Sequence, residues 1–337
     1  MLALLLTVGL AFLVSCLATR ALLGLLRRGA VIDHPNARSS HAIPTPRGGG
    51  IAVVATVVAA ALVSELVGGG WDTASLGPVL GLAVGLGVLS FLDDLRDLSA
   101  GVRIAGHAAA VAGGLWALGG TGAFAAFLPP PLDLTLTALA WLWFINLYNF
   151  MDGIDGIAGS EAVCVAVGIA GLALLGVAPQ GLLGPAAALA GAALGFLVWN
   201  WHRAKVFLGD SGSVPIGYLI GYLLIVAAQP GGGAFAAALV LPLVFVVDAS
   251  VTLLRRVARG KRPTEAHREH AYQRAVQGGW RHDRVCLAVI AANACLIAVA
   301  WFLAPWQPWL ALAAGLAIAG LAYRRLLAVG GSERRAG

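Results

Sequence analysis

The chain has 337 residues, of which 59% are hydrophobic and 11% are charged, and its net charge is +6 at pH 7. A soluble protein carries about 25% charged residues, so this composition excludes an ordinary soluble enzyme and indicates a protein embedded in lipid. The excess of basic residues is expected to reflect membrane topology and attraction to anionic lipid or phosphate, not binding to nucleic acid.

Apolar runs long enough to span a bilayer recur along the whole chain. A spanning helix needs roughly 17–25 apolar residues. We expect about eleven such helices, near residues 2–26, 48–68, 75–92, 103–119, 132–149, 160–177, 182–200, 213–228, 232–254, 284–303 and 307–325. The first run is too long for a signal peptide and is followed by arginines instead of a cleavage site. We therefore predict an all-α polytopic integral membrane protein with a single domain over residues 1–337.

Basic residues occupy alternate gaps between these runs. The remaining gaps, at 69–74, 120–131, 178–181, 229–231 and 304–306, contain no Lys or Arg. Because basic loops remain on the cytoplasmic side, we expect the N-terminus outside, the C-terminus in the cytoplasm and an odd number of spans. Small residues four apart, at Gly81/Gly85, Gly191/Gly195 and Gly217/Gly221, predict close packing between helices.

The first polar segment is an acidic cluster at the end of the third apolar run. Asp93 and Asp97 are one helical turn apart and Asp94 lies beside them. Carboxylates this close repel each other unless a cation lies among them. The pattern therefore indicates a metal site, although a solvated helix end is the alternative.

The second polar segment is the most informative. Asn146, Asn149, Asp152 and Asp155 are spaced by three residues where the fifth apolar run ends, and glycines follow. Carboxylate and amide oxygens suit Mg²⁺, or hydrogen bonds to a nucleobase and ribose. We expect this strip to form part of an active site.

A third acidic residue, Asp210, stands in a tight Gly-Asp-Ser-Gly turn that follows Asn200 and Phe207. Taken alone it is an ordinary turn. Because this turn is expected on the same membrane side as the other two clusters, we predict that Asp210 converges with them on one site.

The fourth segment is basic and contains His267, Arg268 and His270. Guanidinium and imidazole donors suit a diphosphate, although the arginines also satisfy the positive-inside pattern. The two histidines have the spacing of a zinc pair, but no third ligand accompanies them at zinc-enzyme spacing.

His41 and Arg47 form a similar polar strip in the first inner loop. Gly48, Gly49 and Gly50 follow it, and their amides are suited to a phosphate, although a flexible helix start is the alternative.

Taken together, the motifs resemble the polyprenyl-phosphate N-acetylhexosamine-1-phosphate transferases. The resemblance covers about residues 33–285 and depends on five motifs in order: SSHAIPTPRGGG, FLDDLRD, NLYNFMDGIDGIAGSEA, FLGDSGS and EAHREHAYQ. The first and last motifs look closest to the branch that initiates O-antigen synthesis. The lysine that the phospho-MurNAc-pentapeptide branch carries before its glycine turn is absent, which argues against that donor.

The resemblance implies a site for each polar segment. Asp94, Asp155 and Asp210 would bind Mg²⁺, with Mn²⁺ as a substitute. Asp93, Asp94, Asp152, Asp155 and His270 would be catalytic. The remaining residues would bind substrate, with Asn200 and Phe207 at the uracil: Asn146, Asn149, Asn200, Phe207, His41, Arg47, His267 and Arg268.

The reaction implied is transfer of an amino-sugar 1-phosphate from a UDP-sugar to undecaprenyl phosphate at the cytoplasmic face of a bacterial inner membrane. Asp93 is the candidate to accept a proton from the lipid phosphate or to orient it, and covalent catalysis through Asp94 is an alternative. The resemblance is compatible with a homodimer. A secondary transporter is the competing class, but it would place ionisable groups near the bilayer midplane, whereas here nearly all acids lie at the ends of runs. A CDP-alcohol phosphatidyltransferase is a third reading, but its Asp-rich signature is absent.

Overall fold

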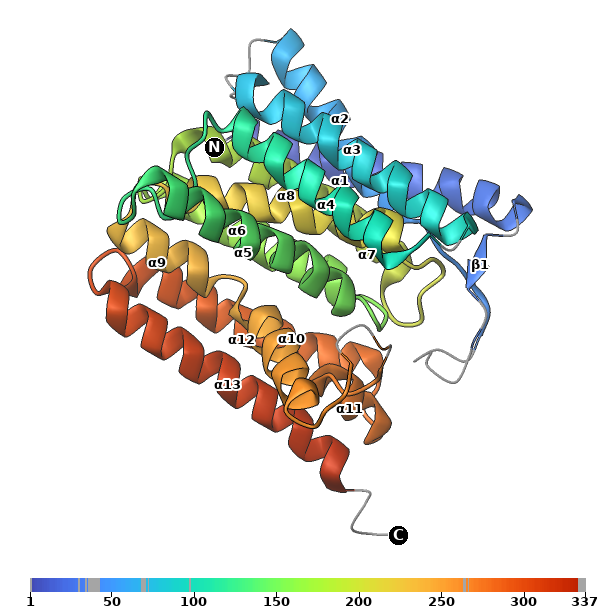
Figure 1. Cartoon of the computed structure of the whole chain (residues 1–337). Helices are drawn as coiled ribbons and strands as arrows, with labels where there is room; N and C mark the ends of the chain where they lie inside the picture. Colours follow the sequence, from blue (N-terminus) through green and yellow to red (C-terminus); the bar gives the residue numbers. More distant parts are fainter. Residues whose placement is uncertain are drawn as a thin grey trace.

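Helices make up most of the described part of the chain (Figure 1). The computed structural model describes residues 2–29, 31–33, 35, 43–67, 71, 73–96, 98–262, 265 and 267–332. Its α-helices are α1 (Leu2–Arg28), α2 (Gly50–Leu66), α3 (Thr73–Arg96), α4 (Ala100–Ala117), α5 (Pro130–Phe150), α6 (Ile157–Leu174), α7 (Leu183–Asn200), α8 (Asp210–Ala228), α9 (Gly232–Val240), α10 (Leu243–Val257), α11 (Ala271–Gln277), α12 (His282–Ala298) and α13 (Pro308–Ser332).

The remaining elements are short. A 3₁₀-helix at Gln180–Leu182 precedes α7, and a π-helical stretch at Val299–Leu303 extends α12. Strands β1 (Ile32–Asp33) and β2 (Thr45–Pro46) pair antiparallel in a two-stranded sheet, with Ile32 opposite Pro46 and Asp33 opposite Thr45.

Every apolar run of the sequence is helical in the structure, which confirms the all-α membrane class. By length and composition, seven helices in the described segments are able to cross a membrane, or eight if one bent pair counts as a span. Helix α2 is apolar but has only 17 residues. Helices α4 and α5 also form where spans were expected, but they are not among the seven.

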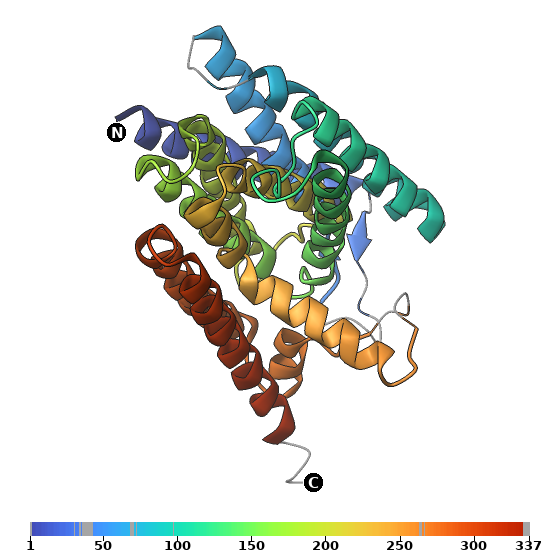
Figure 2. The ribbon, with the colours of Figure 1, turned by 60° about the vertical axis from the view of Figure 1, so that its left-hand side comes forward.

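The ninth predicted span is broken into two helices, contrary to the expectation of one continuous helix over 232–254. Helices α9 and α10 meet at an angle of 65°. Pro242 lies at the break, where it has no N–H to donate to the preceding turn and its ring disfavours a continuing helix. Figures 1 and 2 show that α10 turns away from the direction of α9. The bend directs the polar end of α10 towards α11.

Helix α8 lies at the centre of the bundle. Its hydrophobic span is 89% buried, and it packs against α2, α3, α5, α6 and α9. Trp141 of α5 donates a hydrogen bond from Nε1 to the carbonyl oxygen of Tyr218 at 2.9 Å, and the two rings stack with centroids 4.7 Å apart. Asp210 begins this helix, so its position is set by the most buried element of the fold.

A glycine corner joins β2 and α2 to the N-terminus of α8. The amides of Gly48 and Gly49 donate to the carbonyl of Phe207, and the amide of Gly50 donates to that of Leu208. A Cβ atom on Gly50 would lie 2.2 Å from the Cα of Gly212. The expectation that these three amides bind a phosphate is therefore wrong, because carbonyls at least 158 positions away in the chain already accept from them.

The small-residue pairs have different outcomes. Added Cβ atoms at Gly191 and Gly195 of α7 would lie 2.4 Å and 2.3 Å from carbonyl oxygens of α1, so this pair permits close helix packing as predicted. Added Cβ atoms at Gly217 and Gly221 would instead lie 3.0 Å and 2.4 Å from side-chain atoms of α5. No described atom beyond the neighbouring residues and backbone of α3 itself lies within 4 Å of such a Cβ at Gly81 or Gly85, and the prediction is wrong there.

Candidate active site

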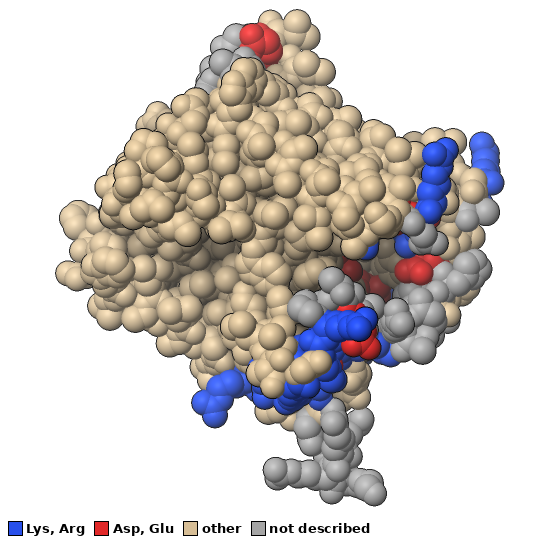
Figure 3. All heavy atoms as spheres, viewed as in Figure 1, with Lys and Arg blue, Asp and Glu red and all other residues tan. Residues whose placement is uncertain are grey.

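Charged side chains gather at one end of the molecule. Helices α3, α5, α8 and α10 each begin or end there, and the sequence motifs lie at or next to these helix ends. On the face shown in Figure 3, acidic groups lie in a hollow bordered by basic groups. Residues that are far apart in sequence line the cavities at this end, so the fold brings the motifs together.

Two cavities occupy this end of the bundle. The first, called here the loop cavity, has a volume of about 240 Å³ and is lined by Asp33, Arg47, Asp152, Gly153, Ile154, Asp155, Asn200, Phe207, Leu208, Gly209, Asp210, Gln273 and His282. The second, the helix cavity, has a volume of about 390 Å³ and is lined by Ser90, Asp93, Ala100, Arg103, Ile104, His107, Asn146, Asn149, Phe150, Asp210, Val214, Ala249, Leu253, Glu265, His267, His270 and Gln273. Asp210 and Gln273 line both, so the two cavities adjoin at these residues.

Asp93 and Asp94, at the end of α3, have different partners. Asp93 lines the helix cavity, forms an ion pair with Arg103 at 3.2 Å and accepts a hydrogen bond from the amide of Leu98 at 2.7 Å. Asp94 forms an ion pair with Arg47 at 3.2 Å. The other carboxylate oxygen of Asp94, Oδ2, is buried with no hydrogen-bond partner. Such an atom is costly to bury without a compensating contact, which suits a cation.

Asn149 connects α5 to the start of α8. Its Nδ2 approaches Asp210 Oδ2 at 3.5 Å, and its Oδ1 accepts a hydrogen bond from Ser213 Oγ at 2.6 Å. Asn146, one turn earlier, donates to the carbonyl of Leu142 and lines the helix cavity. The predicted convergence of Asp210 with the second polar segment is thus present in the fold.

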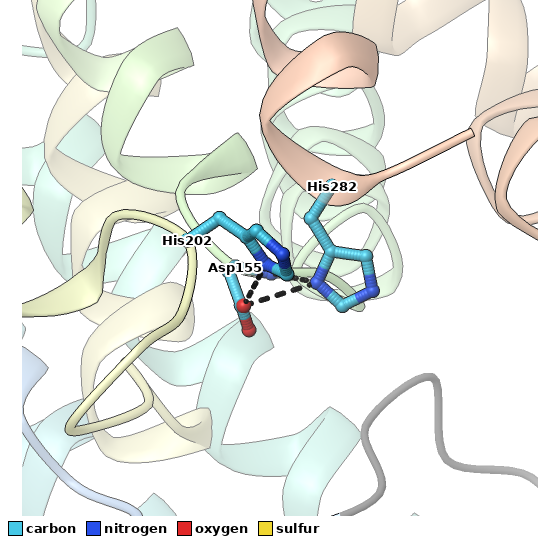
Figure 4. Close-up of side chains that lie close together, drawn as sticks. All are labelled: Asp155, His202 and His282. Atoms are coloured by element: carbon cyan, nitrogen blue, oxygen red, sulfur yellow. Dashed lines mark hydrogen bonds and ion pairs between the residues drawn. The ribbon is translucent and has the colours of Figure 1, made fainter.

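Asp152 and Asp155 lie in the loop after α5 but in different surroundings. Burial, helped by the nearby Asp210 and Asp155 carboxylates, raises the pKa of Asp152 to about 8. Although burial alone would raise the pKa of Asp155, the adjacent imidazoles of His282 and His202 lower it overall. Asp155 Oδ2 lies 2.8 Å from His202 Nδ1 and 3.1 Å from His282 Nδ1 (Figure 4).

Asn200 and Phe207 line the loop cavity as parts of its wall. Asn200 is buried; its Oδ1 accepts from the amide of Gly156 at 2.9 Å, and its Nδ2 donates to the carbonyl of Val206 at 2.9 Å. Phe207 bridges to Arg47 through the backbone. Asn200 therefore lines the cavity and also holds the backbone at Gly156 and Val206 together through its hydrogen bonds.

His270 has a carboxylate partner, Asp248 of α10. His270 Nδ1 lies 3.4 Å from Asp248 Oδ1, and both side chains are buried. Asp248 also accepts hydrogen bonds from the amides of Ala271 and Tyr272, at the first turn of α11. The His267 ring lies beside that of His270, with centroids 4.9 Å apart. Burial, followed by the nearby His270, lowers the pKa of His267 to about 4, so this imidazole is neutral at pH 7.

The basic residues of this segment are organised around Glu269. It forms ion pairs with Arg256, Lys261, Arg259 and Arg274, and hydrogen bonds from Lys261 are the main reason that its pKa is lowered to about 2. Arg268 lies outside both cavity linings, and its backbone carbonyl accepts from Gln277 Nε2 at 2.9 Å.

Two predicted positions, His41 and Asp97, lie outside the described residues. The structure adds five residues outside the sequence motifs to the site: Asp33, Arg103, His107, His202 and His282. It also adds Gln273, which ends the EAHREHAYQ motif but had no predicted role. Nothing in the spacing of His202 or His282 points to Asp155, because their partner is distant in sequence.

Three carboxylates at this end of the bundle fit a hard divalent cation. Asp94 offers a buried oxygen without a partner, Asp210 faces both cavities, and the pKa of about 8 at Asp152 marks a carboxylate that a cation would stabilise. All of these atoms are oxygens, as Mg²⁺ prefers. The fold and the site define a membrane-embedded protein with an acidic site at one end, bordered by basic groups suited to phosphate.

Comparison with known proteins agrees with this class. Residues 76–228 match the model of glycosyl transferase family 4. The decaprenyl-phosphate N-acetylglucosaminephosphotransferase of Mycolicibacterium smegmatis is 32% identical over 298 residues, covering 78% of this chain and 73% of the relative. The phospho-N-acetylmuramoyl-pentapeptide-transferase of Mycolicibacterium paratuberculosis is 32% identical over 90% of this chain and 97% of its own. A probable undecaprenyl-phosphate N-acetylglucosaminyl 1-phosphate transferase of Bacillus subtilis is 28% identical, over 83% and 80%.

The chain therefore belongs to glycosyl transferase family 4, among the polyprenyl-phosphate hexosamine-1-phosphate transferases.

Proposed function

We propose that the protein transfers an N-acetylated amino-sugar 1-phosphate from a UDP-sugar to a polyprenyl phosphate. An oxygen of the lipid phosphate attacks the sugar-side phosphorus, the bond to the UMP oxygen breaks, and UMP leaves while a polyprenyl-diphospho-sugar forms. The observation that carries this proposal is the meeting of two cavities at one acidic residue, Asp210. Such a junction suits two phosphorylated substrates that must react end to end.

The relatives support the substrate classes. Their names specify decaprenyl or undecaprenyl phosphate as acceptor for N-acetylglucosamine phosphate, or phospho-N-acetylmuramoyl-pentapeptide as the group transferred. Because both kinds of relative reach similar identity, they support an N-acetylated hexosamine without deciding between the two sugars. The motif forms favour an amino sugar without the pentapeptide, as in the start of O-antigen or a related envelope glycan.

In this proposal, each of the two cavities binds one of the two substrates. The loop cavity, with Asn200, Phe207, Asp152 and Asp155 in its wall, receives the nucleotide. The helix cavity, with Asp93, Asn146, His267 and His270, receives the lipid phosphate and is lined partly by apolar helix residues that suit a prenyl chain. Arg47, paired with Asp94, stands at the loop cavity, where it is suited to the diphosphate.

Asp94, Asp152 and Asp210 would hold Mg²⁺, which when bound supplies charge neutralisation to a diphosphate. Asp155 is engaged by two histidines and contributes to the nucleotide cavity instead. Asp93 is ion-paired with Arg103, so it orients groups in the helix cavity more readily than it accepts a proton. His270, held by Asp248, donates to phosphate oxygens. Arg268 adds positive charge to this loop.

We propose that the chain spans a bacterial inner membrane eleven times, with its N-terminus outside and its C-terminus in the cytoplasm. The alternation of basic gaps supports this orientation. A transporter is disfavoured because the acidic groups that line the cavities gather at one end of the bundle, not halfway along the spanning helices.

The test is an exchange assay with purified protein. Radiolabelled UMP should enter a UDP-N-acetylhexosamine in the presence of polyprenyl phosphate and Mg²⁺, and should not enter it with EDTA. Incubation with a panel of UDP-amino sugars then identifies the donor. Flux of a sugar across sealed vesicles without any exchange would overturn the proposal in favour of a transporter.

The raised pKa of Asp152 predicts a pH effect on stability. A half-buried carboxyl with a folded-state pKa of about 8, against an ordinary value of about 4, binds its proton more tightly in the folded protein. Its contribution is therefore fully present below pH 4 and is lost as the pH rises through 8. In EDTA, the melting temperature should fall between pH 6 and pH 9. Mg²⁺ should raise it, and more at pH 9, where no proton has to be displaced.

The matched control is Asp152→Asn, which removes the titrating group and keeps the shape of the side chain. Its melting temperature in EDTA should vary less between pH 6 and pH 9 than that of the unaltered protein. Equal slopes for the two proteins would show that Asp152 does not titrate in this range.

A further inference from the structure

A cluster of two histidines and one carboxylate lies beside the loop cavity, which Asp155 and His282 line. Asp155 comes from the loop after α5, His202 from the segment after α7, and His282 from the first residue of α12. Figure 4 shows the two imidazole rings turned towards one carboxylate oxygen. Three separate parts of the chain thus bring metal-binding atoms to one point.

The spacing of the atoms matches a metal site. Asp155 Oδ2 is 2.8 Å from His202 Nδ1 and 3.1 Å from His282 Nδ1, and one ligand atom from each residue lies within 4.8 Å of the others. In a tetrahedral zinc site with bonds near 2.0–2.1 Å, ligand atoms lie about 3.3 Å apart. In the described part of the chain, no other group of histidine, cysteine or acidic residues meets the same criterion.

The hydrogen bonding of His282 also favours a cation. Its Nδ1 lies 3.3 Å from the amide nitrogen of Asp155, which donates to it, and 3.1 Å from the Asp155 carboxylate. A nitrogen that accepts from the amide is unprotonated, which is the form that binds a metal ion. A cation between this nitrogen and the carboxylate oxygen would bind to both atoms.

The surroundings resemble those of an open metal site. The amide of Ala204 donates to Asp155 Oδ2 at 3.2 Å, a contact of the kind that orients metal ligands. Asp155 and His282 line the loop cavity, so a fourth coordination position would face that cavity. Two imidazoles, one carboxylate and one open position are the donor set of many zinc centres, whereas Mg²⁺ prefers oxygen ligands alone.

We infer that Asp155, His202 and His282 form a binding site for a divalent transition metal, with Zn²⁺ as the fitting ion, separate from the Mg²⁺ donors at Asp94 and Asp210. The bound ion joins the loop after α5, the segment after α7 and α12. Its fourth position accepts a water or a ligand oxygen from the loop cavity. The inference does not depend on the proposed transferase activity, because the site is defined by ligands that bind without substrate.

The experiment uses full-length protein in detergent, free of a histidine tag, with Co²⁺ as a spectroscopic probe. We expect one Co²⁺ per chain, the strong visible absorption of a tetrahedral site, loss of that absorption when Zn²⁺ is added, and no loss in excess Mg²⁺. His202→Ala and His282→Ala should each weaken binding by at least about 100-fold. His267→Ala, which removes a histidine of the helix cavity, should leave binding unchanged.

A second variant guards against misfolding. His202→Cys should keep the visible absorption and add a thiolate-to-cobalt charge-transfer band, which only a direct ligand produces. Gel filtration and melting temperature establish that each variant is folded. Absence of the tetrahedral absorption in the unaltered protein, or its persistence in folded protein carrying both His202→Ala and His282→Ala, would overturn the inference. Either result leaves the exchange assay for the transferase unaffected.

Discussion

Replacing Asp210 by Asn is expected to lower UMP exchange by at least about 100-fold, the loss typical of removing one group that stabilises transition-state charge. Asp210 is the acidic residue that lines both cavities, and its carboxylate contacts Asn149 at 3.5 Å. Asparagine keeps the shape and this contact but removes the negative charge. Exchange rates measured over a range of Mg²⁺ concentrations should show a raised Mg²⁺ requirement as well as a lower maximum.

Asp283→Asn is the matched control. Asp283 lies in the first turn of α12 and forms an ion pair with Arg281, but it lines neither cavity. Its replacement should change the exchange rate by less than about twofold, since exposed ion pairs contribute little. An Asp210→Asn protein with unaltered exchange and Mg²⁺ dependence would remove Asp210 from the site.

Replacing Gly50 by Val is expected to lower the melting temperature by about 5–10 °C, because overpacking at this crossing costs about 3 kcal/mol or more. A Cβ atom there would lie 2.2 Å from the Cα of Gly212 and 3.1 Å from the backbone nitrogen of Gly212. Backbone atoms cannot rotate away as a side chain does. The β2–α2 corner would separate from α8, and Arg47 would lose its position beside Asp94.

The same substitution at Gly81 of α3 serves as the comparison. No described atom beyond the neighbouring residues and backbone of α3 itself lies within 4 Å of a Cβ at that position, so Gly81→Val should change the melting temperature by no more than about 2 °C. Thermal unfolding followed by circular dichroism in detergent measures both variants. Equal melting temperatures for the two would contradict the close approach of α2 and α8.

Local sequence patterns predicted most of the helices. Each expected apolar run is helical in the structure, because a helix satisfies its backbone hydrogen bonds within the run itself. The break at Pro242 is the exception. Proline is tolerated inside membrane helices, so its presence alone does not distinguish a kink from a 65° turn.

Features that depend on distant partners were not predictable in the same way. Gly81 and Gly191 stand in similar small-residue pairs, yet only Gly191 packs closely against a backbone. The amides of Gly48–Gly50 seemed suited to phosphate until carbonyls of residues 207–208 proved to be their acceptors. The Asp210–Asn149 contact was easier to anticipate, because both residues end or begin apolar runs on one side.

The common wall at Asp210 has a thermodynamic consequence. Two anions bound on opposite sides of one carboxylate influence each other through its ionisation and through any cation it holds, without touching. If a ligand in the loop cavity changes the affinity of the helix cavity for its own ligand by some factor, the helix-cavity ligand changes the affinity of the loop cavity by the same factor. The potency of an inhibitor that binds only one of the two cavities will therefore depend on the fraction of protein in which the other cavity is occupied.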